Sequence, residues 1–307
     1  MCDDLTRADR AVKPPTDEHV STSLSNSATP ATPEMSRVNA WIVDWGRVVI
    51  RSVIAIGRFS LFVSQTFAWM FSRLPRRETL WPNFYQVGVL SLPVVALTGT
   101  FIGMVLAVQS YFQFRQLGLE TRLGAVINMT LVRELGPVLA ATMLAGRVGS
   151  AMAAELGTMR VTEQIDALSA MGANPVRYLV VPRFLACFFM IPTLTIMADF
   201  MGVAGGYFYS DFVLGIDPHF YWYNSAQFVG WFDLFTGLFK SIFFGSAIAL
   251  VSCYQGFNCD PGAEGVGRAS TASFVYSFVL ILMLDLFLGI ALDNVYFVLF
   301  PQGAQLF

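Results

Sequence analysis

The run from Val87 to Ser110 contains no charged side chain. About 20 consecutive apolar residues let a helix cross the roughly 30 Å hydrocarbon core of a bilayer, and four more apolar stretches follow. The composition agrees, because 55% of the residues are hydrophobic and only 13% are charged, whereas soluble domains are about a quarter charged. The sequence therefore predicts an all-α integral membrane protein with five transmembrane helices, at about residues 87–110, 123–156, 184–210, 241–259 and 271–300.

Two different segments precede this membrane domain, which we place at residues 79–307. Residues 1–36 are rich in Ser, Thr and Pro, contain no apolar core of signal-peptide length, and are expected to be a disordered tail. In residues 37–78 we expect a helix whose arginines, Arg47, Arg51, Arg58 and Arg73, share one narrow face. Such a helix suits the membrane interface. The alternative is a first spanning helix with snorkelling arginines, which would place three of them at membrane depth.

Arginine is concentrated on one side of the five predicted spans. Cytoplasmic loops carry an excess of Lys and Arg. Placing the N-terminus in the cytoplasm leaves only Arg115, Arg122 and Lys240 on the outer side. Because the number of spans is odd, we expect Met1 in the cytoplasm and Phe307 on the opposite side of the membrane.

Several classes of function are disfavoured by what the chain lacks. A net charge of −2 gives no basic field for nucleic acid. Four cysteines without CxxC spacing and two histidines predict no metal site, and the cysteines are expected to be small buried hydrophobes or free thiols. The two lysines, Lys13 and Lys240, lie outside any GxxxxGK[ST] motif, and no hydrolase motif is present. We therefore expect no catalytic residue and no cofactor on this chain, so another subunit would have to hydrolyse any ATP.

The second span carries a ribbon of small residues at every fourth position: Ala141, Ala145, Gly149, Ala153 and Gly157. In lipid, small residues let helix backbones approach closely and gain van der Waals contacts. The ribbon serves either packing within the chain or a symmetric dimer, and the sequence leaves both interpretations open.

Ionisable residues also lie inside the spans. Arg133 and Glu134 come just before Gly136-Pro137, where the proline can kink the helix. Asp285 lies in the last span, and Lys240 is a candidate counter-ion. Such residues at membrane depth normally mark a functional cavity, although a structural salt bridge that fixes the kink is compatible with the same pattern.

Between the second and third spans, an apolar stripe at helical spacing predicts a short amphipathic helix at about residues 161–171. The stripe consists of Val161, Ile165, Leu168 and Met171, and the acidic residues Glu163 and Asp166 lie early, as the helix dipole favours. A helix without a core of its own must dock on the bilayer, on its own bundle or on a partner. Its acidic face disfavours an anionic membrane, so we favour a cytoplasmic partner.

At these residues the chain resembles a known family. The segment RELGPVLAATMLAGRVGSAMAAELGTMRVTEQIDAL (133–168) is similar to the signature of MlaE-type permeases. These are the membrane subunits of ABC transporters that move phospholipids between the inner and outer membranes of Gram-negative bacteria. Further matches are residues 99–106, 182–184 and 262–268 and Asp285, and the resemblance covers about residues 81–300.

The resemblance implies a homodimer with an outward-facing phospholipid cavity, which helps to maintain outer-membrane lipid asymmetry. It implies a cytoplasmic ABC ATPase subunit that carries ATP and Mg²⁺, a periplasmic MCE-domain lipid-binding protein, and in some systems a STAS-domain protein. Residues 161–171 would be the coupling helix to the ATPase. Position by position, the cavity would involve Leu106, Arg133, Glu134, Lys240 and Asp285.

The chain departs from the family pattern at two points. Asn174 stands where many members carry Asp before the proline, which puts a charge contact near the coupling helix in doubt. The long N-terminal tail has no counterpart in shorter members.

Two other classes of function compete with an ABC permease. An ion-gradient-driven secondary transporter would use Glu134, Asp199 or Asp285 as proton carriers, but such folds usually contain internal repeats, which this sequence does not show. An intramembrane lipid-modifying enzyme is the weakest alternative, because no catalytic motif is present.

Overall fold

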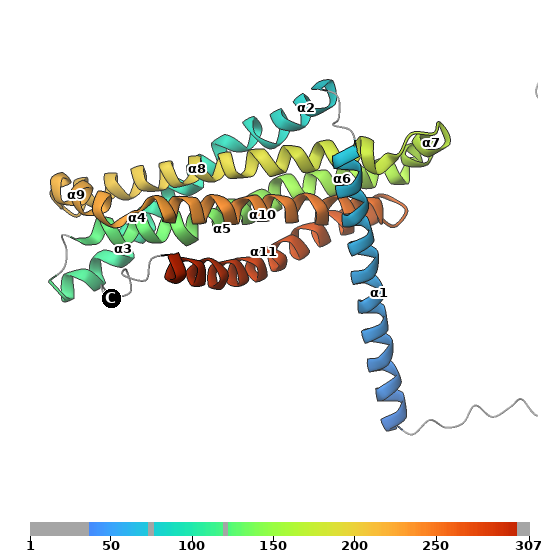
Figure 1. Cartoon of the computed structure of the whole chain (residues 1–307), viewed down its shortest axis with the longest axis horizontal. Coiled ribbons are helices and arrows are strands. Elements are labelled where there is room, and N and C mark those ends of the chain that lie inside the picture. The colour runs from blue at the N-terminus through green and yellow to red at the C-terminus, as the bar shows by residue number, and fades with distance from the viewer. Residues whose placement is uncertain (1–36, 73–76, 119–121, 300–307) are drawn as a thin grey trace, which may run out of the picture. The chain divides into compact units, whose positions relative to one another are not determined.

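The structure, a computed structural model, describes residues 37–72, 77–118 and 122–299. The predicted tail, residues 1–36, lies outside the described residues. The chain divides into two units, residues 1–54 and 55–307, which are described separately. Helix α1 (Arg37–Ser72) begins in the first unit and ends in the second, and all other described elements belong to the second unit (Figure 1).

The described residues contain helices and no strands, which confirms the predicted all-α class. After α1 come α2 (Arg77–Val87), the 3₁₀ turn η1 (Val89–Ser91) and α3 (Leu92–Gln116). The second span consists of α4 (Leu123–Thr130), η3 (Leu131–Leu135), α5 (Gly136–Leu144), η4 (Ala145–Gly149) and α6 (Ser150–Val161). The remaining elements are α7 (Gln164–Ala170), η5 (Val176–Val180), α8 (Val181–Phe212), α9 (Pro218–Phe228), α10 (Trp231–Phe257) and α11 (Ala263–Leu299).

Six described helices are long and apolar enough to cross a membrane. Five of them coincide with the predicted spans, three containing the whole predicted range and two ending two to four residues before its predicted end. The sixth, Trp45–Phe71, is the helix that we predicted to lie in the interface. Length and composition do not separate an interfacial helix from a spanning one, so the interfacial placement remains a prediction.

Helix α10 begins ten residues before the predicted start of the fourth span, at Trp231. The reason is a cap at its N-terminus: the backbone N–H of Gly230 donates to the Asp233 carboxylate at 2.9 Å. An acidic residue in the first turn also suits the helix dipole. The extra turns extend α10 toward the end of the bundle occupied by α9.

Three π-helical turns, η3, η4 and η5, interrupt the long helices. Two of them precede prolines, Pro137 and Pro182. A proline inside a helix lacks an N–H and clashes with the carbonyl four residues earlier, and a wider turn relieves that clash. The kink expected before Pro137 is therefore present as a π turn, in which the Gly136 N–H donates to the Leu131 carbonyl.

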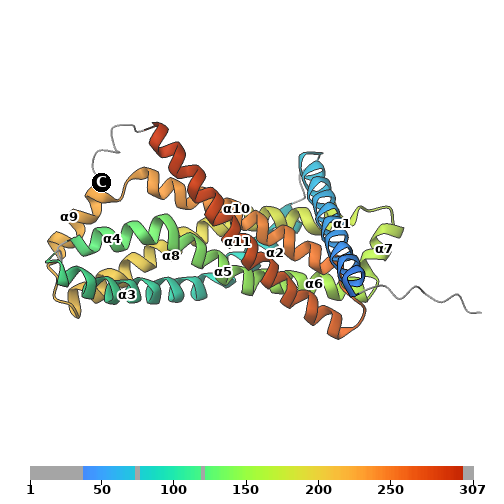
Figure 2. The same ribbon diagram turned by 90° about the horizontal axis from the view of Figure 1, so that it is seen from below.

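Helices α3 and α8 pack closely through glycines. A Cβ atom on Gly103 would overlap the carbonyl oxygen of Gly202, and one on Gly205 would overlap that of Thr100. The two backbones are thus in direct contact, as small residues allow in membrane bundles. Figure 2 shows α3 and α8 at one side of the bundle and α11 crossing α10 diagonally.

The small-residue ribbon of the second span packs within the chain. All five of its residues are buried. A Cβ on Gly149 would lie 2.8 Å from the Ser252 hydroxyl of α10, and Gly157 faces Cys259 and Val266. The intrachain interpretation is therefore confirmed. This face is not available for a dimer contact.

A helix that the sequence analysis did not predict, α9, packs on α4. Tyr221 donates to the Asn128 side-chain oxygen at 3.1 Å, and the Asn128 amide donates to Ser225 at 2.9 Å. Burial raises the pKa of Tyr221 to about 12, so the phenol keeps the proton that it donates. In both views α9 and α7 lie at opposite ends of the bundle (Figures 1 and 2).

Candidate functional site

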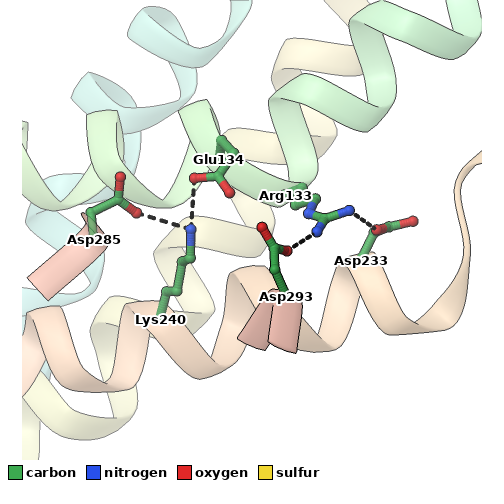
Figure 3. Close-up of polar contacts among 6 residues, drawn as sticks. All are labelled: Arg133, Glu134, Asp233, Lys240, Asp285 and Asp293. Atoms are coloured by element: carbon green, nitrogen blue, oxygen red, sulfur yellow. Dashed lines mark hydrogen bonds and ion pairs between the residues drawn. The ribbon is translucent and has the colours of Figure 1, made fainter. Parts of the chain in front are cut away.

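Four of the five predicted cavity residues are charged, and three of them form one ion-paired group. Lys240 Nζ of α10 lies 2.6 Å from Glu134 Oε2 of η3 and 3.0 Å from Asp285 Oδ1 of α11 (Figure 3). The Lys240 side chain is fully buried. A buried ammonium needs compensation by charge and hydrogen bonds, and the two carboxylates from two other elements supply it. Lys240 is therefore the counter-ion that the sequence indicated.

Arg133 forms a second group beside the first. Its Nη1 lies 3.5 Å from Asp233 Oδ1 at the start of α10, and its Nη2 pairs with Asp293 near the end of α11 (Figure 3). Sequence reasoning did not assign either acid to the site. A signal existed for Asp293, because it follows Asp285 by two helical turns and so shares its face.

We call these six residues the charge cluster: Arg133, Glu134, Asp233, Lys240, Asp285 and Asp293. When all are ionised, four carboxylates face two cations. The Lys240 side chain is fully buried, whereas the Glu134 and Asp293 side chains are 41% and 48% exposed, so solvent reaches the cluster at these two of its four acids. The structural salt bridge is therefore present, and a role of the same residues in a ligand cavity remains a prediction.

The fifth predicted cavity residue, Leu106 of α3, belongs to a different group. It packs with Leu123, Ile127 and Ile216 in a separate apolar cluster. This cluster holds α3 against α4, the helix that leads directly into η3. The place of Leu106 in a cavity therefore remains a prediction.

Gly136 is held between the charge cluster and a buried acid on α8. A Cβ atom at Gly136 would overlap Asp199 Oδ1, so only glycine fits beside this carboxyl group. Asp199 is buried, and its Oδ1 has no hydrogen-bond partner among the described residues. Asp199 therefore packs against the residue that directly follows the turn carrying Arg133 and Glu134.

The predicted coupling segment is not one continuous helix. α6 ends at Val161, Glu163 has a left-handed backbone (φ 60°), and α7 covers only Gln164–Ala170. The break follows Thr162, whose hydroxyl bonds back to the Thr158 carbonyl and so competes with continuation of the helix. The short helix predicted at about 161–171 is therefore present as α7, but it is narrower than predicted and begins at Gln164.

The apolar stripe of this segment is divided between two environments. Ile165 is buried against Leu179 and Val180 of its own bundle, which fixes α7 in place. Met171 is 76% exposed, and Glu163 and Asp166 are exposed as well, while Val161 and Leu168 are partly buried. The surface available to a partner is therefore acidic and apolar, and it excludes Ile165.

Asn174 caps the helix that follows α7. Its side-chain oxygen accepts from the backbone N–H groups of Val176 at 3.0 Å and Arg177 at 3.3 Å. Capping requires an acceptor and no charge, and Asn is as effective as Asp. The departure from the family pattern at this position is thus compatible with the local structure.

The fold and the charge cluster together define a class: a multi-pass, all-helical membrane protein with ion-paired residues inside its spans. Within that class the chain belongs to the MlaE permease family, because the family model described as "Permease MlaE" matches residues 80–291. The match runs from within α2 to within α11, and it includes α7 and the acid Asp285.

Individual relatives agree with this assignment. A Rickettsia bellii protein described as "Probable ABC transporter permease protein" is 40% identical over 238 residues, which are 78% of this chain and 92% of the relative. The "Intermembrane phospholipid transport system permease protein MlaE" of Haemophilus influenzae is 37% identical over 207 residues, or 67% of this chain and 79% of that protein. The chloroplastic protein "TRIGALACTOSYLDIACYLGLYCEROL 1" of Arabidopsis thaliana is 38% identical over 221 residues, 71% of this chain and 63% of the relative.

Proposed function

We propose that this chain is the permease subunit of an ABC transporter that moves phospholipids between the inner and outer membranes and thereby maintains outer-membrane lipid asymmetry. The observation that carries the proposal is the charge cluster, buried around Lys240 and open at Glu134 and Asp293. Polar residues of this kind inside a bundle normally serve a transported molecule. The name of the Haemophilus relative supports phospholipid as that molecule.

The energy source in this proposal is a separate subunit. The chain contains no GxxxxGK[ST] motif, and this loop is what cradles nucleotide phosphates. ATP and Mg²⁺ would therefore bind to a cytoplasmic ABC ATPase, which the names of the Rickettsia relatives favour. In the same proposal the chain forms a homodimer, its N-terminus is cytoplasmic, and its periplasmic end meets an MCE-domain lipid carrier, with a STAS-domain protein on the ATPase.

The proposal is tested by purification in mild detergent, identification of every bound subunit and lipid, and reconstitution of the complex into vesicles. We expect transfer of fluorescent phospholipid to acceptor vesicles to require ATP, and to stop when the ATPase lysine that binds phosphate is replaced. Transfer that continues without ATP but follows a proton gradient would instead favour the secondary transporter that uses Glu134 or Asp285.

The exposed part of the α7 segment gives a sharper prediction about coupling. Met171→Asp should leave insertion and folding unchanged, because the side chain is 76% exposed, but should reduce transport-coupled ATPase activity by roughly tenfold if Met171 packs on the ATPase. Glu163→Arg should act in the same direction through charge reversal. Both variants are measured as ATP hydrolysis by the assembled complex and by co-purification of the ATPase.

Ile165→Ala provides the matched comparison. Because Ile165 packs inside its own bundle, its truncation should lower thermal stability, by about 2–5 kcal/mol for a large-to-small change at a buried site. Full coupling in Met171→Asp, with the ATPase still bound, would show that this surface is not the docking site.

A further inference from the structure

Arg147 lies inside the bundle but, unlike the ion-paired cations there, has no carboxylate partner within the part of the chain that the structure describes. Arg133, Lys240 and Arg183 each pair with at least one carboxylate. Arg147 instead donates to the hydroxyl of buried Ser91, a neutral group, and no ion pair to Arg147 occurs within the described ranges. An arginine inside a membrane span normally pairs with an anion or faces a polar cavity. Arg147 therefore has unused capacity for an anion.

A cavity of about 220 Å³ lies directly beside Arg147. α2 and η1 form one wall and the second span forms the other, and the lining includes Asn83, Gln86, Leu90, Arg147, Ala151 and Met152. A water molecule occupies about 30 Å³ in the liquid, so the cavity has room for one tetrahedral phosphate and its neighbouring atoms. Its lining is polar at Arg147 and the two amides and apolar elsewhere.

The two amides keep donors for such a group. Asn83 donates one amide hydrogen to the Thr79 carbonyl at 2.7 Å, and Gln86 donates one to Glu155 Oε1 at 2.5 Å. Each NH₂ group has a second hydrogen. Arg147 adds a planar fork of N–H groups, which matches phosphate oxygens in pairs.

The local charge balance also favours an anion here. Glu155 is the acid next to the cavity, and it is already engaged, because Arg183 Nη2 lies 3.1 Å from its Oε2 and Gln86 binds its Oε1. Arg147, Arg183 and Glu155 together leave one positive charge. The charge cluster shows the reverse, with four carboxylates for two cations.

The Arg147 cavity and the charge cluster share one feature of backbone geometry. Arg133 is the third residue of the π turn η3, and Arg147 is the third residue of the π turn η4. π turns are rare and are frequent at functional sites. The two arginines are 14 residues apart in the sequence, about 21 Å along a helix axis, and Arg147 lies on the side of the span that leads to α7.

We infer that the Arg147 cavity binds the phosphate group of a phospholipid from the leaflet on the α7 side of the membrane. The exposed side chain of Leu90, which lines the cavity, offers an apolar surface to the lipid chains. The inference rests on the proposed function for the choice of a phospholipid as ligand, and it adds a second lipid site, distinct from the charge cluster and on the opposite half of the same span.

The test is photo-labelling of the intact, detergent-purified complex in phosphatidylcholine nanodiscs. The probe is phosphatidylglycerol with a diazirine next to its glycerol, and labelled peptides are mapped by mass spectrometry without ATP. We expect label on residues 83–90 and 147–152 of the natural protein. Arg147→Gln should reduce it roughly tenfold or more, the scale of losing a charge-assisted bidentate contact, and should leave label near Arg133 unchanged.

Two variants serve as controls for folding and charge. Ser91→Ala removes the neutral partner and keeps the cation, so labelling should stay within about twofold of the natural protein. Arg147→Lys keeps the charge but loses the planar set of guanidinium donors, so its labelling should lie between those of the natural protein and Arg147→Gln. If Arg147→Gln does not fold, Arg147→Lys replaces it as the test.

Three results would overturn the inference. The first is no label in the cavity peptides of the natural protein, as expected if a second copy of the chain fills the cavity, and the second is undiminished label in Arg147→Gln. The third is loss of label when excess inorganic phosphate is added, which would make the ligand a soluble phosphate. Because no ATP is added, failure here is distinct from failure of ATP-dependent lipid transfer, which alone bears on the proposed function.

Discussion

Lys240→Met is expected to lower the thermal stability of the purified protein and to abolish lipid transfer. The substitution removes the ammonium group that lies 2.6 Å from Glu134 and 3.0 Å from Asp285, and it leaves two carboxylates facing each other without a cation. Removing one partner of a buried ion pair is destabilising by about 3–5 kcal/mol. Because Glu134 is 41% exposed and water can reach it, we expect the lower end, a fall in melting temperature of roughly 5–10 °C.

A triple variant separates the structural from the functional role of these residues. Glu134→Gln, Lys240→Met and Asp285→Asn together remove all three charges and nearly keep their volumes, and such replacements of buried ion pairs are often close to neutral in stability. We expect the melting temperature to recover while lipid transfer stays low. Recovered transfer would show that the three residues only hold the bundle together, and an unchanged melting temperature in Lys240→Met would contradict the buried pairing itself.

The one-dimensional pattern of the sequence was sufficient to predict the five long apolar helices. Hydropathy and length are properties of consecutive residues, so the five spans and the all-α class followed from them directly. The same pattern placed Glu134 and Asp285 inside spans and Lys240 at the outer end of one, and the restriction on ionised groups in lipid then suggested Lys240 as a counter-ion. The structure brings these three together as expected.

The partners of Arg133 could not be found in the same way. Asp293 is 160 residues away in the chain, and Asp233 lies before the predicted start of its span, so neither was tied to Arg133 by local spacing. The small-residue ribbon posed a similar problem. Gly149 can approach Ser252 or a second copy equally well, and only the three-dimensional packing decides which neighbour is present.

Two local features were within reach of the sequence but were not used. Asp217-Pro218 begins α9, with the Asp217 carboxylate accepting from the His219 N–H at 2.9 Å, and this is a common start of a helix. The break at Glu163 was hidden by an apolar stripe that continues at helical spacing on both sides. The spacing of apolar residues does not reveal that one residue has a left-handed backbone. That spacing assumes a continuous helix, whereas a left-handed residue changes the direction in which all following side chains point.

Gly103→Ala is expected to disrupt the bundle more than its single added methyl group suggests. The new Cβ would overlap the carbonyl oxygen of Gly202 and come within 2.7 Å of the Gly202 carbonyl carbon. Both obstacles are backbone atoms, so no rotamer change relieves the clash, and α3 and α8 must move apart along their contact. Overpacking of this kind typically destabilises by about 1–3 kcal/mol, occasionally more, and we expect the upper end because each backbone packs directly on the other.

Gly57→Ala is the matched control, because it makes the same chemical change in a helix where no atom lies within 4 Å of the added Cβ. Alanine is favoured over glycine in helices by about 1 kcal/mol, so Gly57→Ala should be neutral or slightly stabilising, and Gly103→Ala should fall in melting temperature and in folded yield by size-exclusion chromatography. Equal behaviour of the two variants would mean that α3 and α8 do not meet at Gly103 and Gly202. Helix propensity alone would raise stability in both variants. A fall in stability in Gly103→Ala but not in Gly57→Ala therefore measures the effect of the direct backbone contact between α3 and α8.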